Sequence, residues 1–316
     1  MELVKPSAEI WEQGNTLEDM WKHIARCTRV CYQSTPKNDG ETDEEFVKRV
    51  ILRQDSSTGR LNFVKIHGAM LEHGTIYLKI YSNHFIRGND PGTKYVDNKY
   101  SKSRYSHDYR CWYITTNLRV IYENNWLDDL QYICAPTEYH VKRVTVSFTT
   151  NIGVSREFNR HRVNSIAEES TRYCNYNKRN DGQIKIGLPA WLLDDENIEY
   201  IEHHADDTLY SYCEDIVDKT AIRANGWCDI DYYLFALICA EFCYNNLISK
   251  GWKPQQAREV LPLATKTQLI HTAFVDDWKH FFALRADGVS GPPHPNAALV
   301  AKPLKEEFIK RDYITL

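Results

Sequence analysis

The chain has 316 residues, 42% of them hydrophobic, so it is long enough to bury one large core or two small ones. Its formal net charge of -4 argues against a protein whose main task is to coat DNA or RNA, because such domains are usually strongly basic. No apolar run reaches the roughly 18 residues of a membrane span, and the first residues, MELVKPSAEIWEQG, have neither a basic nor an apolar region. We therefore expect no membrane span and no secretory signal.

The nine cysteines are an odd number, and most of them lie within apolar runs. Without a secretory signal, this pattern is typical of reduced thiols in a cytoplasmic protein. Two pairs, Cys27/Cys31 and Cys239/Cys243, are four residues apart and would each share a helix face. Zinc sites normally use tighter pairs in matched sets, so packing as small apolar residues is the favoured interpretation, and we predict no metal site.

Helix and strand signals alternate along the first half of the chain. Two helix starts carry capping boxes, in which a threonine and an acidic residue three positions later satisfy the first helix amides: Thr16 with Asp19, and Thr42 with Glu45. Helices are predicted over residues 16–32, 42–51, 62–73 and 118–134, and strands over residues 76–81, 111–116 and 143–149.

We expect strand 143–149 to pair with strand 76–81 in a central antiparallel sheet. Further helices are predicted over residues 198–223 and 230–249, from Pro254 to Pro262, and over 265–284. The pattern predicts an α+β fold: a central antiparallel β-sheet flanked by long α-helices, in a single compact domain covering residues 1–316.

A polar, tyrosine-rich stretch covers about residues 82–110, with no steady apolar period and with glycine and proline interruptions. A loop of that length inside a compact domain is usually either functional or poorly ordered. It could form a lid over a site, or its lysines, arginines and tyrosines could bind an anionic partner. Its composition favours a third interpretation, a solvated insertion.

Residues 156–176, REFNRHRVNSIAEESTRYCNY, hold four arginines within 17 residues. Arginine grips phosphate with two parallel donors, so this density points to a site for phosphorylated small molecules. The glutamates in the same segment argue against a general nucleic-acid surface. A helix over residues 154–162 would place Arg156 and Arg160 on one face and turn His161 toward another direction, so one segment could serve two ligands.

An ordinary surface helix is the alternative interpretation, because arginines interleaved with glutamates commonly form a solvated, salt-bridged face. The segment continues, however, into the Ser-Thr-Arg-Tyr run at residues 170–173, which a plain helix surface does not need. This run favours a binding site. A non-catalytic nucleotide- or RNA-binding protein that uses the same arginines stays open as a second hypothesis.

Three short motifs resemble one known family. Arg-His-Arg at residues 160–162, followed after seven residues by Ser170 and then by Arg-Tyr at 172–173, resembles the signature of the flavin-dependent thymidylate synthases. Ala-Arg-x-x-Leu-Pro at residues 257–262 and Leu-Arg-Ala-Asp at residues 284–287 are similar to two further motifs of that family. Three motifs in the family's order make coincidence a poor explanation.

The resemblance implies an enzyme that makes dTMP from dUMP by FAD-dependent reductive methylation, with 5,10-methylenetetrahydrofolate as carbon donor and NADPH as reductant. We find no convincing cysteine nucleophile, because Cys134 lies in Cys-Ala-Pro and Cys174 has no histidine near it in sequence. The uracil would instead be activated by a fixed guanidinium that stabilises negative charge at N3 and O4. The resemblance assigns this catalytic role to Arg285; a helix-terminal arginine paired with Asp287 is the alternative.

The remaining roles also come from the resemblance. Residues expected to bind dUMP are Glu157, Arg160, Glu168, Ser170, Thr171, Arg172, Arg258 and Arg285, with Arg172 and Arg258 on the phosphate. Residues expected to bind FAD are Thr75, Arg160, His161, Arg162, Glu168, His280 and His294. Residues that differ from those of the family are Cys31 (serine), Glu157 (often glutamine), Phe274 (asparagine), Asp276 (arginine) and His280 (asparagine).

The family assembles as homotetramers in which each site is built from more than one subunit, so the resemblance implies a homotetramer here. The unusually apolar helix at 230–249 is consistent with a buried position or with a subunit interface. We expect a cytoplasmic enzyme with small-molecule substrates and with no nucleic-acid or membrane partner.

Overall fold

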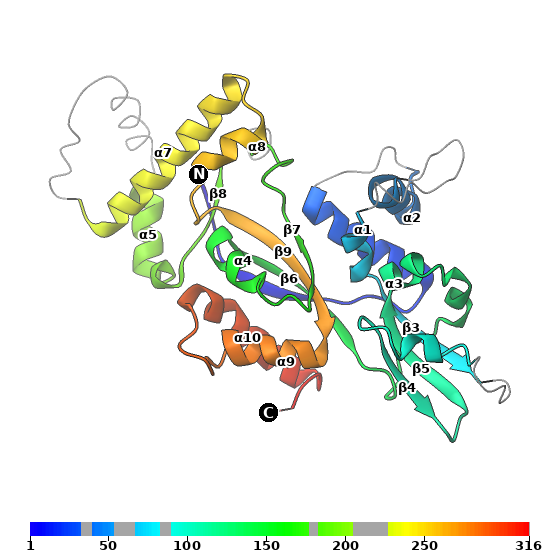
Figure 1. Ribbon diagram of the computed structural model, residues 1–316. Helices are drawn as coiled ribbons and strands as arrows, with labels where there is room; N and C mark the ends of the chain where they lie inside the picture. Colours follow the sequence, from blue (N-terminus) through cyan, green and yellow to red (C-terminus); the bar gives the residue numbers. More distant parts are fainter. Residues whose placement is uncertain (33–39, 54–66, 83–89, 177–182, 205–226, 316) are drawn as a thin grey trace.

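The computed structural model describes residues 1–32, 40–53, 67–82, 90–176, 183–204 and 227–315 (Figure 1). At its centre lies a four-stranded sheet in which all neighbouring strands are antiparallel. Its strands, in spatial order, are β2 (Ser7–Trp11), β6 (Arg143–Asn151), β9 (Lys266–Phe274) and β7 (Ser165–Glu168). The predicted α+β class with a central antiparallel sheet is therefore confirmed.

The predicted partner of strand 143–149 is wrong. β6 pairs with β2 and β9, whereas β3 (Thr75–Tyr81) pairs with β5 (Cys111–Asn117) in a second sheet that also contains β4 (Lys102–Ser106). β6 is buried along almost its whole length, so it needs a partner on each edge. One of those partners, β9, lies in a segment whose pattern predicts a helix.

That segment, residues 265–284, contains both a strand and a helix, which corrects the prediction of one helix. β9 runs to Phe274, and α9 (Val275–Arg285) follows at once. β9 is a central strand with both faces buried, so its hydrophobic residues do not alternate with polar ones, and the signal that separates a strand from a helix is lost.

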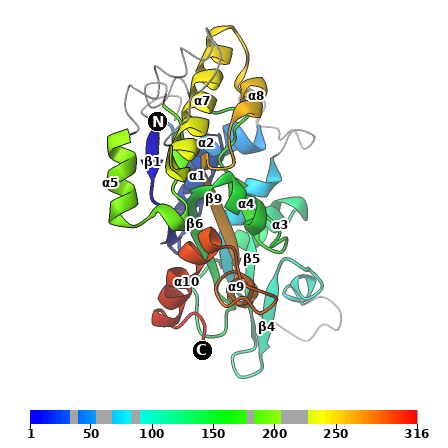
Figure 2. The ribbon, with the colours of Figure 1, turned by 90° about the vertical axis from the view of Figure 1, so that its left-hand side faces the viewer.

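The central sheet has one apolar face and one largely polar face. On the apolar face, Val146 and Phe148 pack in a core with residues of α4 (Ile152–Phe158), α9 and α10 (Pro295–Lys310). Figure 2 shows α9 and α10 lying together at one end of the sheet. On the other face, Thr145 points toward α1 (Leu17–Tyr32), where its hydroxyl lies 3.1 Å from Nε2 of His23.

A buried histidine lies on each face of this sheet. His23 contacts the sheet from α1, and Nδ1 of His271 in β9 lies 3.0 Å from Nδ2 of Asn164. Burial, with smaller contributions from Arg26 and Arg143, lowers the pKa of His23 to about 4. Burial, with a smaller contribution from His161, lowers the pKa of His271 to about 3. Both imidazoles are therefore neutral in the folded protein at neutral pH.

Lowering the pH is expected to destabilise the fold through these histidines. The unfolded chain takes up their protons as the pH falls through about 6.5, while the folded chain resists protonation until well below that value. This stabilisation is thus complete above about pH 6.5 and is lost at about 1.4 kcal/mol per pH unit per histidine below it. Urea denaturation at a series of pH values measures the free energy of unfolding. Below about pH 6.5 this free energy should fall less steeply with decreasing pH for His23→Gln than for the wild type. Equal slopes in the two proteins would contradict the prediction.

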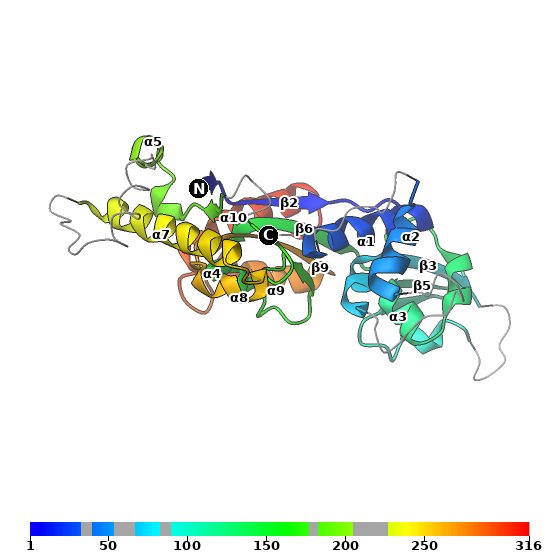
Figure 3. The ribbon, with the colours of Figure 1, turned by 90° about the horizontal axis from the view of Figure 1, so that it is seen from above.

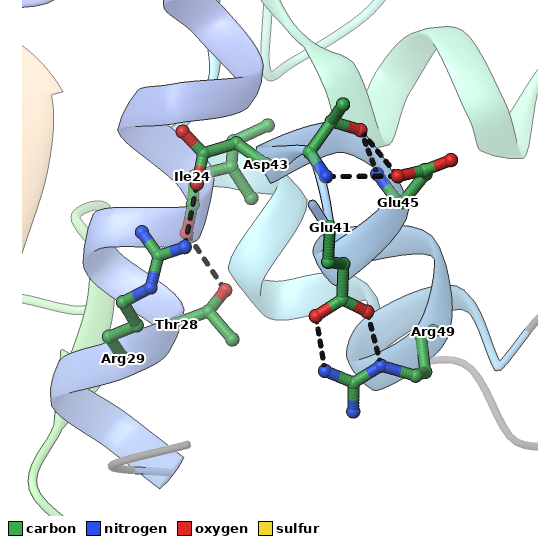
Figure 4. Close-up of polar contacts among 8 residues, drawn as sticks. Ile24, Thr28, Arg29, Glu41, Asp43, Glu45 and Arg49 are labelled. Carbon is green, nitrogen blue, oxygen red and sulfur yellow. Dashed lines mark hydrogen bonds and ion pairs between the residues drawn. The ribbon is translucent and has the colours of Figure 1, made fainter. Parts of the chain in front are cut away.

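The N-terminal helices form as predicted. α1 begins with the Thr16–Asp19 capping box, in which the two side chains and backbone amides bond reciprocally. α2 (Asp43–Val47) has the second box at Thr42 and is followed by η1 (Lys48–Leu52). Figure 4 shows how α2 is held to α1: Arg29 donates to Asp43 at 2.6 Å.

Two other predicted helices need correction. Within residues 62–73, residues 62–66 lie outside the described chain, and the rest contains a 3-10 helix, η3 (Gly68–His73). The segment predicted as one helix over 118–134 consists of α3 (Leu118–Glu123) and η5 (Leu127–Tyr132). Asn125 has a φ of 57° between them, a left-handed conformation that ends a helix.

The stretch at about residues 82–110 contains regular structure, which corrects the view of it as a loop. Residues 83–89 lie outside the described chain, but β4 pairs with β5, and η4 (Thr93–Tyr95) packs beside η5. The buried ring of Tyr95 donates its hydroxyl to Asp129 at 2.6 Å and lies edge-on to Trp126. β4 alternates exposed and partly buried residues, as an edge strand does, which explains its polar sequence.

Seen from above in Figure 3, the molecule is drawn out, with the β3–β5 sheet at one end and α5 (Asp195–His204) and α7 (Asp229–Ser249) at the other. The predicted helix at 230–249 is confirmed as α7, whereas the one at 198–223 is described only to residue 204. Leu234 and Ile238 of α7 are buried, whereas Tyr232 and Cys243 of the same helix are exposed. The other elements are β1 (Glu2–Val4), β8 (Lys185–Gly187), η6 (Ala190–Leu192), α5 (Asp195–His204), α7 (Asp229–Ser249), α8 (Pro254–Ala257) and η7 (Arg258–Val260).

Within the described ranges, no helix is both long enough and apolar enough to pass through a bilayer. Nor does that part of the chain hold a group of three or more His, Cys, Asp or Glu side chains able to bind a metal ion. Of the cysteine pairs predicted to pack as small apolar residues, Cys27 is buried, Cys31 and Cys239 are partly buried and Cys243 is exposed. The packing prediction is therefore wrong for Cys243.

Candidate active site

The short helix α4 carries the start of the arginine segment. Its cap, Asn151, accepts a hydrogen bond from the backbone N–H of Val154 at 2.9 Å, and the buried Phe158 anchors its end against Phe148. The helix ends at Phe158, four residues earlier than the predicted helical segment over 154–162. Arg156 therefore lies on the helix and Arg160 in the turn after it, so the two arginines are not successive positions of one helix face.

A cavity of about 750 Å³ opens where the end of α4, the end of α9 and the loop before α10 meet. It brings together residues from the Arg-His-Arg and Leu-Arg-Ala-Asp motifs, which are more than 100 positions apart in sequence. Six of the predicted site residues line it: Glu157, Arg160, His161, His280, Arg285 and His294.

Arg285 is held at the side of this cavity by three hydrogen bonds. Its Nη1 donates to Oε2 of Glu157 at 2.6 Å, and its Nη2 donates to the backbone carbonyl of the same residue at 2.8 Å. Its Nε donates to Nε2 of His161 at 3.2 Å. One acceptor on each guanidinium nitrogen leaves the side chain little freedom to rotate, so Arg285 is preorganised.

His161 accepts the hydrogen bond from Arg285 through Nε2, which requires a neutral ring with its proton on Nδ1. Burial, with the nearby Arg285 and His280, lowers the pKa of His161 to about 4. The His161 ring is thus uncharged at neutral pH, and it can orient the guanidinium without repelling it.

The predicted phosphate-binding residues form a separate cluster, outside the cavity lining given above. Nη1 of Arg258 donates to Oγ1 of Thr171 at 3.3 Å, and the backbone N–H of Arg172 donates to Oγ of Ser170 at 3.3 Å. The backbone N–H of Ser170 donates to the carbonyl of Cys31 at the end of α1. Arg172 is exposed, so its guanidinium is accessible to a ligand.

Comparison with known proteins places these motifs in one family. The sequence model described as "Thymidylate synthase complementing protein" matches residues 137–310, more than half of the chain. The chain belongs to this family of flavin-dependent thymidylate synthases. The resemblance noted in the Arg-His-Arg signature is therefore confirmed, and the matched residues include the whole lining of the cavity.

A curated relative, the flavin-dependent thymidylate synthase of Synechocystis sp. (strain ATCC 27184 / PCC 6803 / Kazusa), is 36% identical over 59 residues. That alignment covers 19% of this chain and 27% of the relative, so the chain spans about a quarter of the relative's length. Two solved structures of the UMP/dUMP methylase PolB from Streptomyces cacaoi, bound with 5-Br dUMP and with 5-Br UMP, are both 15% identical. The alignments cover 98% of this chain and 93% and 92% of those chains, with TM-scores of 0.39 and 0.40.

Thr75 lies outside the residues that match the family. It starts β3, is buried, and its Oγ1 accepts a hydrogen bond from Nη1 of Arg143 at 3.3 Å. It lines a different cavity, of about 200 Å³, together with Gln13 and Tyr77. The structure does not place it beside the family's Arg-His-Arg turn, and its flavin contact stays a prediction.

Of three further predicted positions, His294 lines the main cavity, whereas Glu168 and Arg162 are not among its lining residues. Glu168 in β7 accepts hydrogen bonds from Asn159, at 2.9 Å, and from Thr267, at 3.1 Å, so it holds the turn that precedes Arg160. Arg162 is exposed. His294 caps α10 by accepting from the backbone N–H of Asn296 at 3.2 Å.

Two positions at which this chain departs from the family's usual residue lie at the start of α9. Phe274 is buried, with the guanidinium carbon of Arg143 5.5 Å from its ring centre. Asp276 is exposed and paired with Lys279 at 3.0 Å. Neither residue is among those that line the cavity.

Sequence reasoning missed the loop of residues 290–293, which closes one side of the cavity. A glycine and proline cluster is the only sequence signal for it. Gly288 has a φ of 70°, and a side chain there would meet the carbonyl of Gly291 at 2.8 Å, so the turn requires glycine. Arg156, which had no assigned role, also lines the cavity.

Proposed function

We propose that this family member makes dTMP from dUMP by FAD-dependent reductive methylation. In this proposal 5,10-methylenetetrahydrofolate donates the carbon, NADPH is the reductant, and no cysteine acts as nucleophile. The observation that carries the proposal is the preorganised Arg285, which Glu157 and His161 hold at a cavity lined by the family's signature residues.

The cavity suits a flavin nucleotide in its charge and chemistry. Arg156 and Arg160 both line it with exposed side chains, and neither has an ion-pair partner among the described residues. Such free guanidiniums are what a pyrophosphate group needs. The residues proposed to hold FAD are Thr75, Arg160, His161, Arg162, Glu168, His280 and His294. When bound and reduced, FAD supplies a hydride.

Arg285 is proposed to activate the uracil. Because its guanidinium is already oriented, it can stabilise negative charge on the pyrimidine oxygen without reorganising during the reaction. The side chain is about 15% exposed, so water screens this interaction less than it would at the surface. Arg285 thus takes the place of the covalent activation that a cysteine would provide.

The two cysteines considered as nucleophiles, Cys134 and Cys174, are not among the residues that line the cavity. Sγ of Cys134 lies 3.7 Å from the carbonyl of Tyr77, and burial raises the pKa of the Cys134 thiol. Cys174 is buried. A raised thiol pKa disfavours the reactive thiolate, which supports the proposal of a route without a cysteine nucleophile.

Ser170, Thr171, Arg172 and Arg258 are proposed to bind the phosphate of dUMP. Because this cluster and the main cavity are separate in one chain, we propose that a second copy brings them together in a homotetramer. The partly exposed apolar helix α7 offers a surface for such assembly. A cytoplasmic location stays a prediction from the cysteine pattern.

The test is an anaerobic reaction of the purified protein. NADPH is used to reduce the bound flavin, dUMP and 5,10-methylenetetrahydrofolate are added, and dTMP is measured by chromatography. The expected result is dTMP formation with flavin reoxidation that requires both additions. A protein that binds no flavin, or reduced flavin without dTMP, would overturn the proposal and favour the non-catalytic nucleotide-binding hypothesis.

The phosphate assignment makes a separate prediction. Arg258→Ala removes one of two proposed phosphate ligands, so the KM for dUMP should rise by about tenfold to a hundredfold, since a charged hydrogen bond contributes about 1.5–3 kcal/mol. The kcat at saturating dUMP should change little, because Arg285 remains in place. Arg119→Ala, which alters a partly buried, salt-bridged arginine outside the site, is the control. An unchanged KM in Arg258→Ala would contradict the assignment.

A further inference from the structure

β2 forms one edge of the central sheet. The spatial order of the strands is β2, β6, β9 and β7, so β2 pairs with β6 on one side only. In an antiparallel pair, every second residue turns its backbone N–H and C=O away from the partner strand. Within the described part of the chain, no strand and no backbone hydrogen bond reaches the outer edge of β2. That edge therefore offers free backbone donors and acceptors.

A groove of about 590 Å³ runs between this edge and α10. Residues 6–10 line one wall, and Leu299, Pro303 and Leu304 of α10 contribute to the other. Because successive side chains of a strand point to opposite faces, a wall made of consecutive residues is the backbone edge itself. An open strand edge beside an apolar helix is an arrangement that suits an extended peptide bound as an added strand.

The two faces of β2 differ in polarity. Ala8 and Ile10 are partly buried and pack against the core that contains α10. Ser7 and Glu9 point to the opposite face and are exposed, with 68% of the Glu9 side chain accessible. A strand added to β2 would continue both faces. Its side chains would thus alternate between the groove beside α10 and the surface beside Glu9.

Glu9 gives that surface a negative charge that is only weakly compensated. Its Oε1 lies 3.8 Å from Nη2 of Arg26, whose guanidinium is stacked over Trp11 and whose side chain is 48% exposed. An ion pair of that length and exposure contributes little. Glu307 and Arg311, which also line the groove, pair with each other at 2.6 Å. A basic side chain is therefore the best match for the position beside Glu9.

We propose that the β2 edge binds an extended peptide of another protein in which apolar residues alternate with basic ones. The apolar side chains lie in the groove against α10, and the basic side chains lie beside Glu9. Main-chain hydrogen bonds to β2 supply affinity, and the alternation supplies specificity. The residues of β2 are not among those that line the main cavity, so this binding goes beyond the proposed function and does not depend on it.

A second copy of this chain fits the edge less well than a basic peptide. Antiparallel pairing of β2 with the β2 of a second copy would bring the two Glu9 carboxylates to opposite or nearby positions, and like charges there are destabilising. Pro6 has no backbone N–H, so pairing does not extend past the start of β2. Charge therefore favours the basic peptide.

The probe is a seven-residue peptide of alternating valine and lysine, blocked at both ends, and its binding to the complete protein is measured by fluorescence polarisation. We expect saturable binding that slows hydrogen exchange within residues 6–11, measured by mass spectrometry. The same peptide with alternate backbone nitrogens methylated lacks the N–H groups that pair with β2. It should bind about tenfold more weakly or worse.

A charge exchange tests the role of Glu9. Glu9→Lys should lower the affinity for the valine–lysine peptide by about threefold to tenfold and raise the affinity for a valine–glutamate peptide by a similar factor. Glu9→Gln, which removes the charge without reversing it, should give intermediate values for both peptides. Glu306→Lys alters an exposed acid of α10 that does not line the groove and should behave as the wild type.

Three results would overturn the proposal. One is the absence of valine–lysine peptide binding at millimolar concentration, and another is equal binding of the two peptides by the wild type. The third is an edge already protected from exchange in the protein alone, with a sedimentation rate that Glu9→Lys changes, because a second copy would then occupy the edge. All three results leave the proposed function standing, since dTMP formation is assayed separately.

Discussion

Replacing Arg285 with alanine is expected to lower kcat/KM for dTMP formation by about a hundredfold to a thousandfold, as the loss of one preorganised donor commonly does. The variant loses the only guanidinium that Glu157 and His161 hold in a fixed orientation within the described lining of the cavity. The loss should appear mainly in kcat, because the group acts on charge that develops during the reaction. Single-turnover dTMP formation from reduced protein measures it directly.

Arg285→Lys tests whether charge alone is sufficient. Lysine retains the charge, but its single ammonium group cannot donate to both Glu157 and His161 in the geometry of the guanidinium. Only a small part of the activity should therefore return. Circular dichroism should show an intact fold in both variants, because the helix containing Arg285 is anchored by other residues. An Arg285→Ala protein with at least half of the wild-type rate would show that uracil is activated elsewhere.

Replacing Trp278 with alanine is expected to lower the free energy of unfolding by about 3–5 kcal/mol. The Trp278 side chain is fully buried in the core on the apolar face of the central sheet, with its ring centre 5.2 Å from that of Phe281 and 5.3 Å from that of Phe308. Its Nε1 also donates to the carbonyl of Val144 at 3.1 Å, so the variant loses a buried hydrogen bond as well as packing.

Urea denaturation of Trp278→Ala should be compared with that of Trp252→Ala, whose side chain is 47% exposed. Trp252→Ala should lower the free energy of unfolding by less than about 1 kcal/mol, because removing an exposed side chain leaves no cavity. Similar losses in the two variants would contradict the assignment of Trp278 to the core. Because Trp278 anchors α9 beneath β6, Trp278→Ala should also loosen Arg285 at the end of the same helix.

Local signals predicted the helix starts and the chemistry-bearing motifs well. The capping boxes at Thr16 and Thr42 involve residues three positions apart, so the information is contained in a short stretch of sequence. Through the family resemblance, the Arg-His-Arg motif predicted His161 as an FAD residue and the Leu-Arg-Ala-Asp motif predicted Arg285 as a dUMP residue, and the two side chains lie within hydrogen-bond distance. What each residue binds stays a prediction.

Non-local structure was predicted poorly, for an identifiable reason. β6 pairs with β9 across more than 100 residues, and β9 does not alternate polar and apolar residues because both of its faces are buried. With no alternation, the pattern of β9 resembled a helix, and strand 76–81 was predicted as the partner of β6. Single-sequence periodicity contains no information on which strands meet.

The amino-acid sequence by itself determined the family, the mixed fold class and six of the twelve described residues that line the cavity, because these depend on short motifs and on residue type. Only the tertiary structure decided that α4 ends at Phe158, that Glu157 and His161 grip Arg285, and that the phosphate cluster lies apart. The reason is physical: a hydrogen bond between residues 128 positions apart forms only after the sheet between them has assembled, and local sequence does not encode that assembly.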